Sequence, residues 1–189
     1  MKTGKEYKKS LQKMKPNIYK FGELIKDVTT HPATKRTVEG HAQIFDAAQK
    51  DEYKDLLTAK YNLTGETVCR YLSILQNADD MIANVRMKRL MFNLTGTCTG
   101  GRCAGFNAIN AMWAATYDID KENNTDYHNR IKNWLKNAQK NDITLAGALT
   151  DPKGDRSKSP SQQADPDMSL HVVEEKKDGI VVRGAKVMI

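Results

Sequence analysis

The sequence predicts a mainly α-helical fold that is followed by a shorter β region. Apolar residues recur at helical spacing through the first 140 residues. The pattern changes near residue 141, where a polar, Pro-rich stretch leads into two β-prone runs joined by a Lys-Asp-Gly turn. We therefore expect an N-terminal helical domain over residues 1–140 and the beginning of a β domain over residues 141–189.

The first two predicted helices lie before residue 60. Tyr7, Leu11 and Met14 have helical spacing, and Pro16 ends that pattern. A second helical segment begins near Ala42 and continues its apolar face to Leu57.

Two further helices are predicted to begin at acidic residues, because carboxylates satisfy the free N–H groups of a first turn. Asp79-Asp80 begins one of them, and Thr125-Asp126 caps the other. The apolar faces that we expect in the core are Met81, Ile82, Val85, Leu90 and Leu94 in the first, with Arg89 among them, and Tyr127, Ile131, Trp134, Leu135 and Ala138 in the second.

The β region begins with a short predicted strand at residues 143–145 and continues through a long loop over residues 150–167. Residues 170–173 form a second strand, and Lys177-Asp178-Gly179 turns the chain into a return strand that resumes at residues 187–189. Because an isolated hairpin is barely stable, we expect the chain to be cut inside a β domain. A short protein with a buried last strand is the equally weighted alternative.

Composition and charge exclude several classes of protein. Of the 189 residues, 39% are apolar and 28% charged, which argues against a disordered chain. No run of 18 apolar residues occurs, so we expect no membrane partner. The first thirty residues lack the apolar core of a signal peptide, which predicts a cytoplasmic protein. The net charge is +7, yet basic runs are doublets such as Lys8-Lys9, and we expect no nucleic-acid partner.

A glycine-rich segment at residues 94–105 carries two of the three cysteines, Cys98 and Cys103. Their spacing allows both sulfurs to reach one soft metal or cluster, and Arg102 is expected to lower the pKa of the thiols. The paired C-x2-C pattern of a zinc site is absent, and no other Cys or His is spaced as a further ligand. Two buried loop thiols without a metal are therefore the favoured alternative on spacing alone.

A second segment, residues 148–156, places Lys153 and Arg156 on either side of Gly154 in a loop after a short strand. Such a loop offers backbone N–H groups and cations to an anionic or polar ligand. It is not a phosphate-binding P-loop, because no Gly-Lys-Ser/Thr sequence follows the strand. A plain surface turn remains an equal alternative.

A series of motifs runs along nearly the whole chain in a fixed order. They are Gly4-Lys5-Glu6-Tyr7, Phe21-Gly22-Glu23, His31-Pro32, Asn62-Leu63-Thr64-Gly65, Asp79-Asp80, Met87-Lys88-Arg89-Leu90, the two-cysteine segment, residues 115–120, residues 150–156, Gln163 with Asp165-Pro166-Asp167, and residues 178–186. Taken together, these motifs resemble the flavoprotein family of 4-hydroxyphenylacetate 3-hydroxylases and 4-hydroxybutyryl-CoA dehydratases.

Within this family the chain is more similar to the dehydratase branch. That resemblance implies FAD and a 4Fe-4S iron–sulfur cluster, with Cys98 and Cys103 as two of the four cluster ligands. The hydroxylase branch uses an Arg, a Tyr and a His; Arg102 matches, whereas Phe106 and Gly147 stand at the other two positions. Dehydratases usually separate the two cysteines by three residues, and here four intervene, which leaves room for a flavin-only relative or another acyl-CoA substrate.

The resemblance also implies the flavin site and the wider architecture. The residues implied to contact FAD are Leu149, Thr150, Asp151, Pro152, Lys153, Gly154, Asp155, Arg156, Lys186, Met188 and Ile189. The implied fold is that of the acyl-CoA dehydrogenases: a helical N-terminal domain, a middle β domain and a C-terminal helical bundle. That bundle, supplied by a missing C-terminal region or a complementary chain, would hold the remaining cluster ligands, the catalytic bases and most of a homotetramer interface.

The leading hypothesis is the N-terminal part of an enzyme that dehydrates 4-hydroxybutyryl-CoA to crotonyl-CoA and isomerises vinylacetyl-CoA, and that is inactive as an isolated chain. A flavin-dependent monooxygenase component that acts on 4-hydroxyphenylacetate is the second hypothesis. The third is a non-catalytic truncated or split subunit, which the apolar end of the sequence favours.

Overall fold

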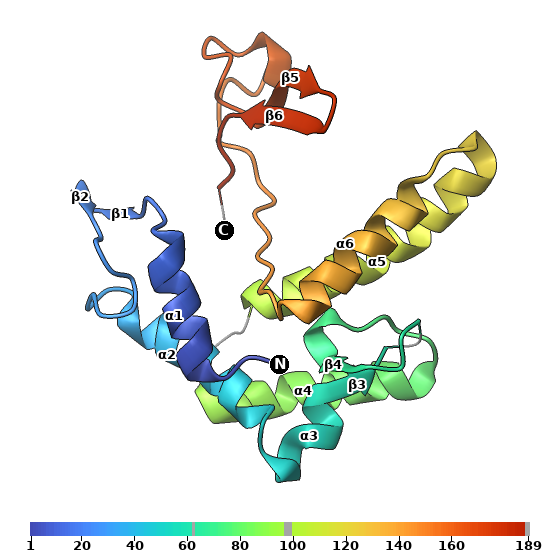
Figure 1. Ribbon diagram of the computed structural model, residues 1–189. Coiled ribbons are helices and arrows are strands. Elements are labelled where there is room, and N and C mark those ends of the chain that lie inside the picture. Colours follow the sequence, from blue (N-terminus) through green and yellow to red (C-terminus); the bar gives the residue numbers. More distant parts are fainter. Residues whose placement is uncertain (62, 97–99, 188–189) are drawn as a thin grey trace. The chain divides into compact units, whose positions relative to one another are not determined.

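The computed structural model describes residues 1–61, 63–96 and 100–187 and divides into two compact units (Figure 1). Unit 1 is Met1–Leu145 and unit 2 is Ala146–Ile189. The sequence placed a domain boundary between residues 140 and 141, and the contacts divide the chain between residues 145 and 146. The domain assignment itself stays a prediction, because compactness alone does not show independent folding.

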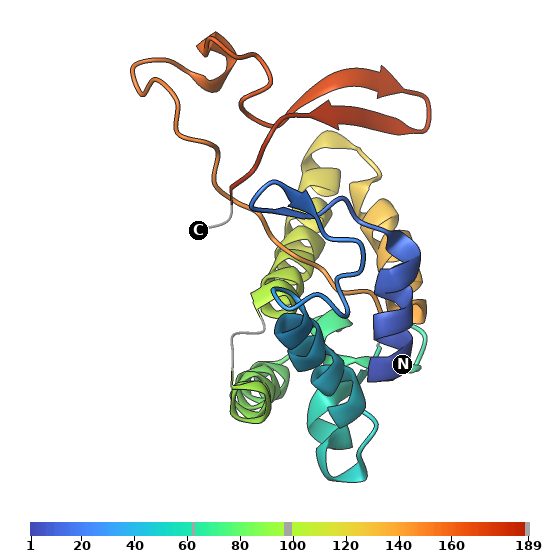
Figure 2. The ribbon, with the colours of Figure 1, turned by 90° about the vertical axis from the view of Figure 1, so that its left-hand side faces the viewer.

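Unit 1 is mainly helical, as the sequence predicts. Its helices are α1 (Gly4–Met14), α2 (Lys35–Ala47), α3 (Asp51–Leu57), α4 (Ala78–Thr95), α5 (Gly100–Asn123) and α6 (Tyr127–Lys140). Local sequence explains where several of them begin. Thr3 and Glu6 form a reciprocal capping box at the start of α1, and the Asn77 side chain accepts a hydrogen bond from the Asp80 N–H, 2.9 Å, at the start of α4. Figure 2 shows α1 to α6 from a second side.

Two short hairpins, neither of which the sequence predicted, lie between the helices of unit 1. Strand β1 (Tyr19–Lys20) pairs with β2 (Glu23–Leu24), and β3 (Thr58–Lys60) pairs with β4 (Thr67–Cys69), each antiparallel. Gly22 and Gly65 adopt positive φ in the two connections, which only glycine does without strain. Strands of two or three residues are too short to show an alternating pattern, so only these turns marked them in the sequence.

The core of unit 1 consists of two clusters of buried side chains. The first joins α2, α3, α4 and the start of α5, and contains Ile44, Ala47, Ala48, Leu57, Cys69, Tyr71, Met87, Met91 and Phe106. The second joins the β3–β4 hairpin to α5 and α6, and contains Tyr61, Val68, Leu72, Ile74, Ile109, Leu135 and Ala138. The predicted face of α6 is confirmed at Ile131, Leu135 and Ala138, whereas Tyr127 and Trp134 are exposed.

The prediction for the buried face of α4 was wrong except at Leu90, which is partly buried and packs against the first core cluster. The helix buries Asn84, Met87 and Met91, while Met81, Ile82, Val85 and Leu94 are exposed. Helix α4 carries apolar residues on both sides, so periodicity alone does not select one face. Packing against α2 and α3 decides which side is covered.

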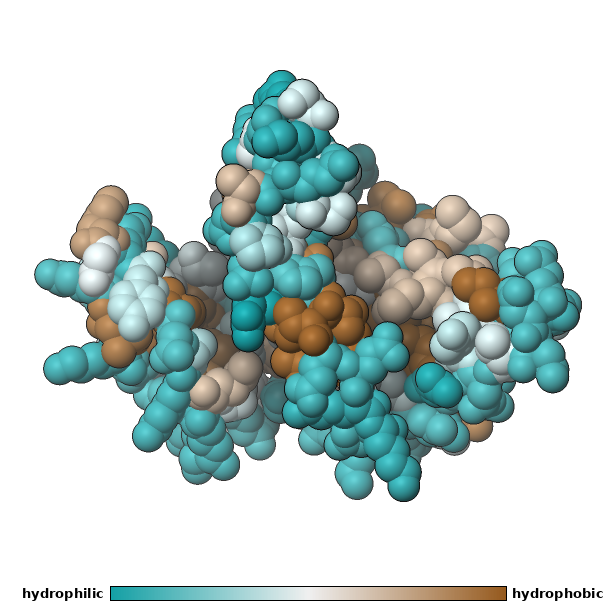
Figure 3. All heavy atoms as spheres, turned by 90° about the horizontal axis from the view of Figure 1, so that it is seen from above, coloured by the Kyte–Doolittle hydropathy of each residue, from teal (hydrophilic) through white to brown (hydrophobic). Residues whose placement is uncertain are grey.

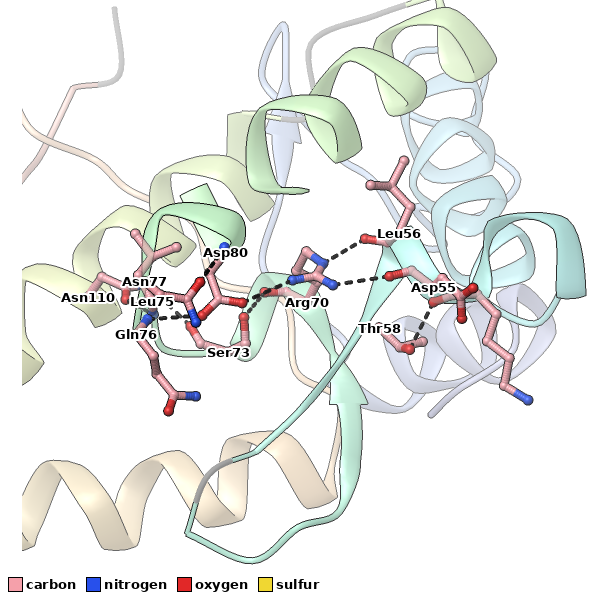
Figure 4. Close-up of polar contacts among 11 residues, drawn as sticks. Asp55, Leu56, Thr58, Arg70, Ser73, Leu75, Gln76, Asn77, Asp80 and Asn110 are labelled. Carbon is pink, nitrogen blue, oxygen red and sulfur yellow. Dashed lines mark hydrogen bonds and ion pairs between the residues drawn. The ribbon is translucent and has the colours of Figure 1, made fainter. Parts of the chain in front are cut away.

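Arg70 fixes the segment between β4 and α4 (Figure 4). It lies in a short 3-10 helix, η1 (Arg70–Leu72), and its guanidinium donates to the backbone carbonyls of Leu56, 2.7 Å, and Asp55, 3.1 Å. The Asp80 carboxylate lies 3.7 Å from the same guanidinium. Burial lowers the pKa of Arg70, and Asp80 opposes that shift. These contacts tie the end of α3 to the start of α4.

The end of unit 1 differs from the prediction in two ways. The backbone N–H groups of Tyr127 and His128 donate to the Asp120 carboxylate, 2.9 and 2.7 Å, so α6 is capped from α5 and not by the side chains of Thr125 and Asp126. Residues 143–145 form no strand. They follow the left-handed residue Asp142 (φ 39°) and pack Ile143 and Leu145 against the second cluster.

Unit 2 contains the predicted hairpin. Strand β5 (His171–Lys176) pairs antiparallel with β6 (Gly179–Arg183) through the predicted turn at residues 177 and 178, with an irregularity in register between Val172 and Glu174. A 3-10 helix, η2 (Pro160–Gln162), interrupts the long loop. The expected return of the chain at residues 187–189 is described only at Val187, which forms a bridge with Thr150.

The surface is largely hydrophilic, with separate apolar areas on the face that Figure 3 shows. Within residues 1–61, 63–96 and 100–187, no helix has both the length and the apolar content that a bilayer crossing requires.

Leu135 tests the second cluster. The substitution Leu135→Ala removes a side chain with 0% exposure and should lower the free energy of unfolding by about 2–5 kcal/mol, because a cavity remains. Leu63→Ala makes the same chemical change at a residue with 47% exposure and should cost less than about 1 kcal/mol. Urea denaturation followed by circular dichroism measures both; equal losses would contradict this assignment of the core.

Candidate functional site

The predicted flavin loop is joined to the residues that follow β6. Val187 donates its N–H to the Thr150 carbonyl at 2.8 Å, and the Thr150 hydroxyl donates to the Val187 carbonyl. Lys186 Nζ lies 2.7 Å from an Asp151 carboxylate oxygen and 3.3 Å from the Leu149 carbonyl oxygen. The structure thus joins Lys186 to the loop, and the contact of Lys186 with FAD that the resemblance implies stays a prediction. Met188 and Ile189 lie outside the described residues.

Gly154 and Gln163 give the loop its shape. The Gln163 side chain accepts from the Asp155 N–H, 2.9 Å, and donates to the Asp155 carbonyl, 2.9 Å. A Cβ at residue 154 would overlap the ends of the Gln163 and Met168 side chains, so a larger residue there would displace the Gln163 side chain that shapes the loop. The Asp155 carboxylate accepts from the Ser157 N–H and hydroxyl, and these bonds lower its pKa.

The loop surrounds a shallow hollow of about 190 Å³. Residues Asp151–Arg156 line it, together with Lys158, Pro160, Gln163, Met168 and Ser169. Within the described part of unit 2, no carboxylate forms an ion pair with Lys153 or Arg156, whereas Lys158 pairs with Asp155 at 3.5 Å. Two cations thus remain at the rim for an anionic group. This arrangement fits the phosphates of a dinucleotide, although the hollow is smaller than a pocket for an entire cofactor.

Cys103 lies on a helix, where the sequence predicted a loop. Helix α5 begins at Gly100, so its first turn contains Cys103, which is half-buried against the first core cluster. Cys98 lies outside the described residues. Among the residues that are described, no group of three or more His, Cys, Asp or Glu side chains is arranged to hold a metal ion.

Arg102 is one of the most buried charged residues of unit 1. Its guanidinium forms an ion pair with Asp142 at 3.0 Å, with side-chain exposures of 1% and 5%. The guanidinium also stacks on Phe45, 4.1 Å from the ring centre, and the Lys2 N–H donates to the second Asp142 oxygen at 3.0 Å. The sequence assigned Arg102 to the neighbouring thiols, whereas in the structure its charge is paired with Asp142.

Cys69 and His41 are among the titratable groups that interact with the charge of Arg102. Burial raises the pKa of the Cys69 thiol, and the Arg102 cation acts in the opposite direction. Burial lowers the pKa of His41, and Arg102 lowers it further. Both groups are therefore uncharged near neutral pH, which makes Cys69 a structural thiol and not a nucleophile.

Sequence reasoning missed Asp142 and placed Gln163 only within a motif. The sequence contains one indication of a structural role for Asp142: it belongs to the Asn141-Asp142 pair after α6, and such pairs are typical of turns. Its pairing with Arg102, 40 residues earlier, is a tertiary contact that local sequence does not reveal.

Comparison with known proteins places the chain in a family. The model of the family described as 4-hydroxyphenylacetate 3-hydroxylase N terminal matches residues 3–189. The chain belongs to this family. The match confirms the resemblance found in the ordered motifs.

Three relatives carry the comparison further. The chain is 43% identical over 184 residues to 4-hydroxybutyryl-CoA dehydratase/vinylacetyl-CoA-Delta-isomerase of Clostridium aminobutyricum, covering 97% of this chain and 37% of that protein. It superposes on an oxygen-tolerant archaeal 4-hydroxybutyryl-CoA dehydratase from N. maritimus with a TM-score of 0.89 and 37% identity, over 98% of this chain and 36% of that one. The chain also superposes on the oxygenase component of a 4-hydroxyphenylacetate 3-monooxygenase complexed with FAD and 4-hydroxyphenylacetate. The TM-score is 0.82 and the identity 28%, over 98% of this chain and 38% of that one. The chain thus spans little more than a third of each.

The Arg102–Asp142 pair yields a stability prediction. Asp142→Ala leaves a buried guanidinium without its partner and should lower the free energy of unfolding by about 3–5 kcal/mol. Glu174→Ala removes the partner of Lys176 in an exposed pair, 3.4 Å, and should cost no more than about 1 kcal/mol. Denaturant unfolding of both variants measures the difference; a loss at Asp142 no larger than at Glu174 would refute a stabilising pair.

His41 yields a pH prediction. Because its pKa is lower in the fold than in the unfolded chain, the unfolded chain binds the proton first as pH falls below about 6.5. The contribution of His41 to the free energy of unfolding is therefore fully present above about pH 6.5. It is lost as the pH falls through the lowered pKa of His41 in the folded state. In His41→Gln the free energy of unfolding should fall less between about pH 7 and pH 5. His31→Gln is the control, and identical pH profiles for wild type and His41→Gln would contradict the prediction.

Proposed function

We propose that this chain is the N-terminal part of a flavoenzyme that converts 4-hydroxybutyryl-CoA to crotonyl-CoA and water, and that isomerises vinylacetyl-CoA to crotonyl-CoA. The observation that carries the proposal is the 43% identity to the Clostridium enzyme over 97% of this chain. Phe106, buried in the first core cluster, and Gly147 disfavour phenol hydroxylation, because they replace the polar residues of the hydroxylase branch.

The reaction has a specific chemical difficulty. The hydroxyl leaves from C4 of the acyl chain, and one hydrogen leaves each of C2 and C3; the thioester carbonyl activates the hydrogen on C2 and does not activate the one on C3. One of these two hydrogens joins the hydroxyl as water, and the other is added to C4. Isomerisation of vinylacetyl-CoA moves one hydrogen from C2 to C4 and releases nothing. Bound FAD supplies reversible electron transfer for such chemistry.

The loop Leu149–Arg156 is the part of this chain that we propose holds FAD. Its support is the pair of uncompensated cations, Lys153 and Arg156, at the rim of the hollow around Gly154. The bonds of Lys186 to Leu149 and Asp151 hold the loop in one conformation before the cofactor binds. The role of these residues is to bind and orient the phosphates.

Cys98 and Cys103 are proposed as two of the four ligands of a 4Fe-4S cluster, with the other two from residues outside this chain. The support is family resemblance and the position of Cys103 in the first turn of α5, half-buried beside the core. We further propose the acyl-CoA dehydrogenase-like architecture, completion by a C-terminal helical bundle, assembly as a homotetramer and a cytoplasmic location.

Flavin binding tests the loop. The double substitution Lys153→Gln and Arg156→Gln should weaken FAD binding about tenfold or more, because two charge-assisted contacts to phosphate are lost. Lys176→Gln with Lys177→Gln makes the same change in net charge at the tip of the β5–β6 hairpin and should leave affinity within about twofold. Quenching of flavin fluorescence measures both. Equal affinity in the two double variants would exclude the loop as the phosphate site.

Turnover tests the assignment of the reaction. With FAD and anaerobic iron–sulfide reconstitution, the isolated chain should neither hold a stoichiometric cluster nor form crotonyl-CoA; addition of the complementary C-terminal region should restore both. Iron and sulfide analysis and chromatography of the CoA esters provide the measurements. Hydroxylation of 4-hydroxyphenylacetate by the completed enzyme, with reduced FAD and oxygen, would instead establish the monooxygenase function.

A further inference from the structure

A hollow of about 480 Å³ lies between α1 and α2, and neither the flavin loop nor the cysteines contribute to it. The residues that line it are Lys5, Lys8, Lys9, Gln12, Thr29, Thr30, Lys35 and Glu39. Its α1 residues stand at i, i+3, i+4 and i+7, so they share one face of that helix. Lys35 and Glu39 are likewise neighbours on one face of α2. The hollow is therefore built from two packed helices and the loop before α2.

Its charge is strongly positive for its size. Lys8 binds both oxygens of Glu39, at 3.1 and 3.2 Å, which neutralises one of the four ammonium groups. Within the described parts of the chain, no carboxylate forms an ion pair with Lys5, Lys9 or Lys35. The first turn of α2 also contains no acidic residue, so nothing there offsets Lys35.

The uncharged lining residues are already oriented by hydrogen bonds. Asp27 accepts from the N–H and the hydroxyl of Thr29, 2.8 and 2.7 Å, and these bonds lower the pKa of Asp27 and keep it ionised. Gln12 donates to Asp27 and to Thr29, 3.2 Å each. With Asp27 counted beside Glu39, four lysines face two carboxylates, 4 − 2 = +2.

We propose that this lysine hollow binds an anion with several clustered phosphate groups, of the triphosphate class. Three ammonium groups without an ionic partner line one concave site, and an anion with several phosphate groups offers them more charge-assisted hydrogen bonds than a single phosphate does. The site is distinct in residues from the flavin loop, since its lining comes only from unit 1. It does not depend on the proposed dehydratase function.

Calorimetric titration of the chain with inorganic tripolyphosphate tests the site. We expect saturable binding that weakens as salt rises, because phosphate contacts between exposed charges are screened. The triple variant Lys5→Gln, Lys9→Gln, Lys35→Gln should bind about tenfold or more weakly. A matched variant with Lys132→Gln, Lys136→Gln and Lys140→Gln, all on α6, changes net charge equally and should bind within about twofold of wild type.

Two further arms distinguish the alternatives. Orthophosphate should bind more weakly than tripolyphosphate, because a single phosphate group offers the three lysines fewer charge-assisted hydrogen bonds. Backbone amide shifts in an NMR titration should change in α1 and at the start of α2, which locates the site even where a variant fails to fold. Equal weakening in both triple variants, shifts confined to residues 149–156, or tighter binding of a single-stranded oligonucleotide than of tripolyphosphate would overturn the proposal.

Discussion

The buried ion pair between Arg102 and Asp142 joins segments of unit 1 that are distant in the sequence. Arg102 lies at the start of α5, Asp142 follows α6, and the guanidinium stacks on Phe45 of α2. The N–H of Lys2 donates to the same carboxylate, so the residues before α1 are held at this point too. Because an unpaired charge in such a position costs several kcal/mol, the four segments can only close around the complete pair.

The same pair joins the two ends of the chain segment between Arg102, beside the candidate cluster ligand Cys103, and Asp142, ahead of the candidate flavin loop. Cys103 follows Arg102 directly, and Asp142 lies three residues before Leu145, where unit 1 ends and the chain continues to the flavin loop. Leu145 packs so closely on α5 that a Cβ at Gly105 would overlap it. The last residues of unit 1 are thus held along the first turns of the helix that carries the candidate cluster ligand.

Unit 2 is stabilised differently. The strands of its hairpin are almost entirely exposed, and the candidate flavin loop is shaped by hydrogen bonds to Gln163, Asp155 and Lys186. Polar contacts of this kind contribute little net stability in water, but they restrict the loop to one shape. A loop that is ordered before its ligand arrives loses less conformational entropy on binding, which favours a preformed cofactor site.

The sequence by itself determined the helical character of unit 1, the β5–β6 hairpin and the family, because helical periodicity, turn residues and ordered motifs are local signals. It also indicated Lys153 and Arg156 as cations near a glycine turn. Tertiary structure decided which side of α4 is buried, that the segment with Cys103 is helical, and that Arg102 pairs with Asp142. These outcomes depend on contacts between segments that are far apart in the sequence. The packing and ion pairing of such segments produce no periodic pattern in the local sequence, so they cannot be predicted from it.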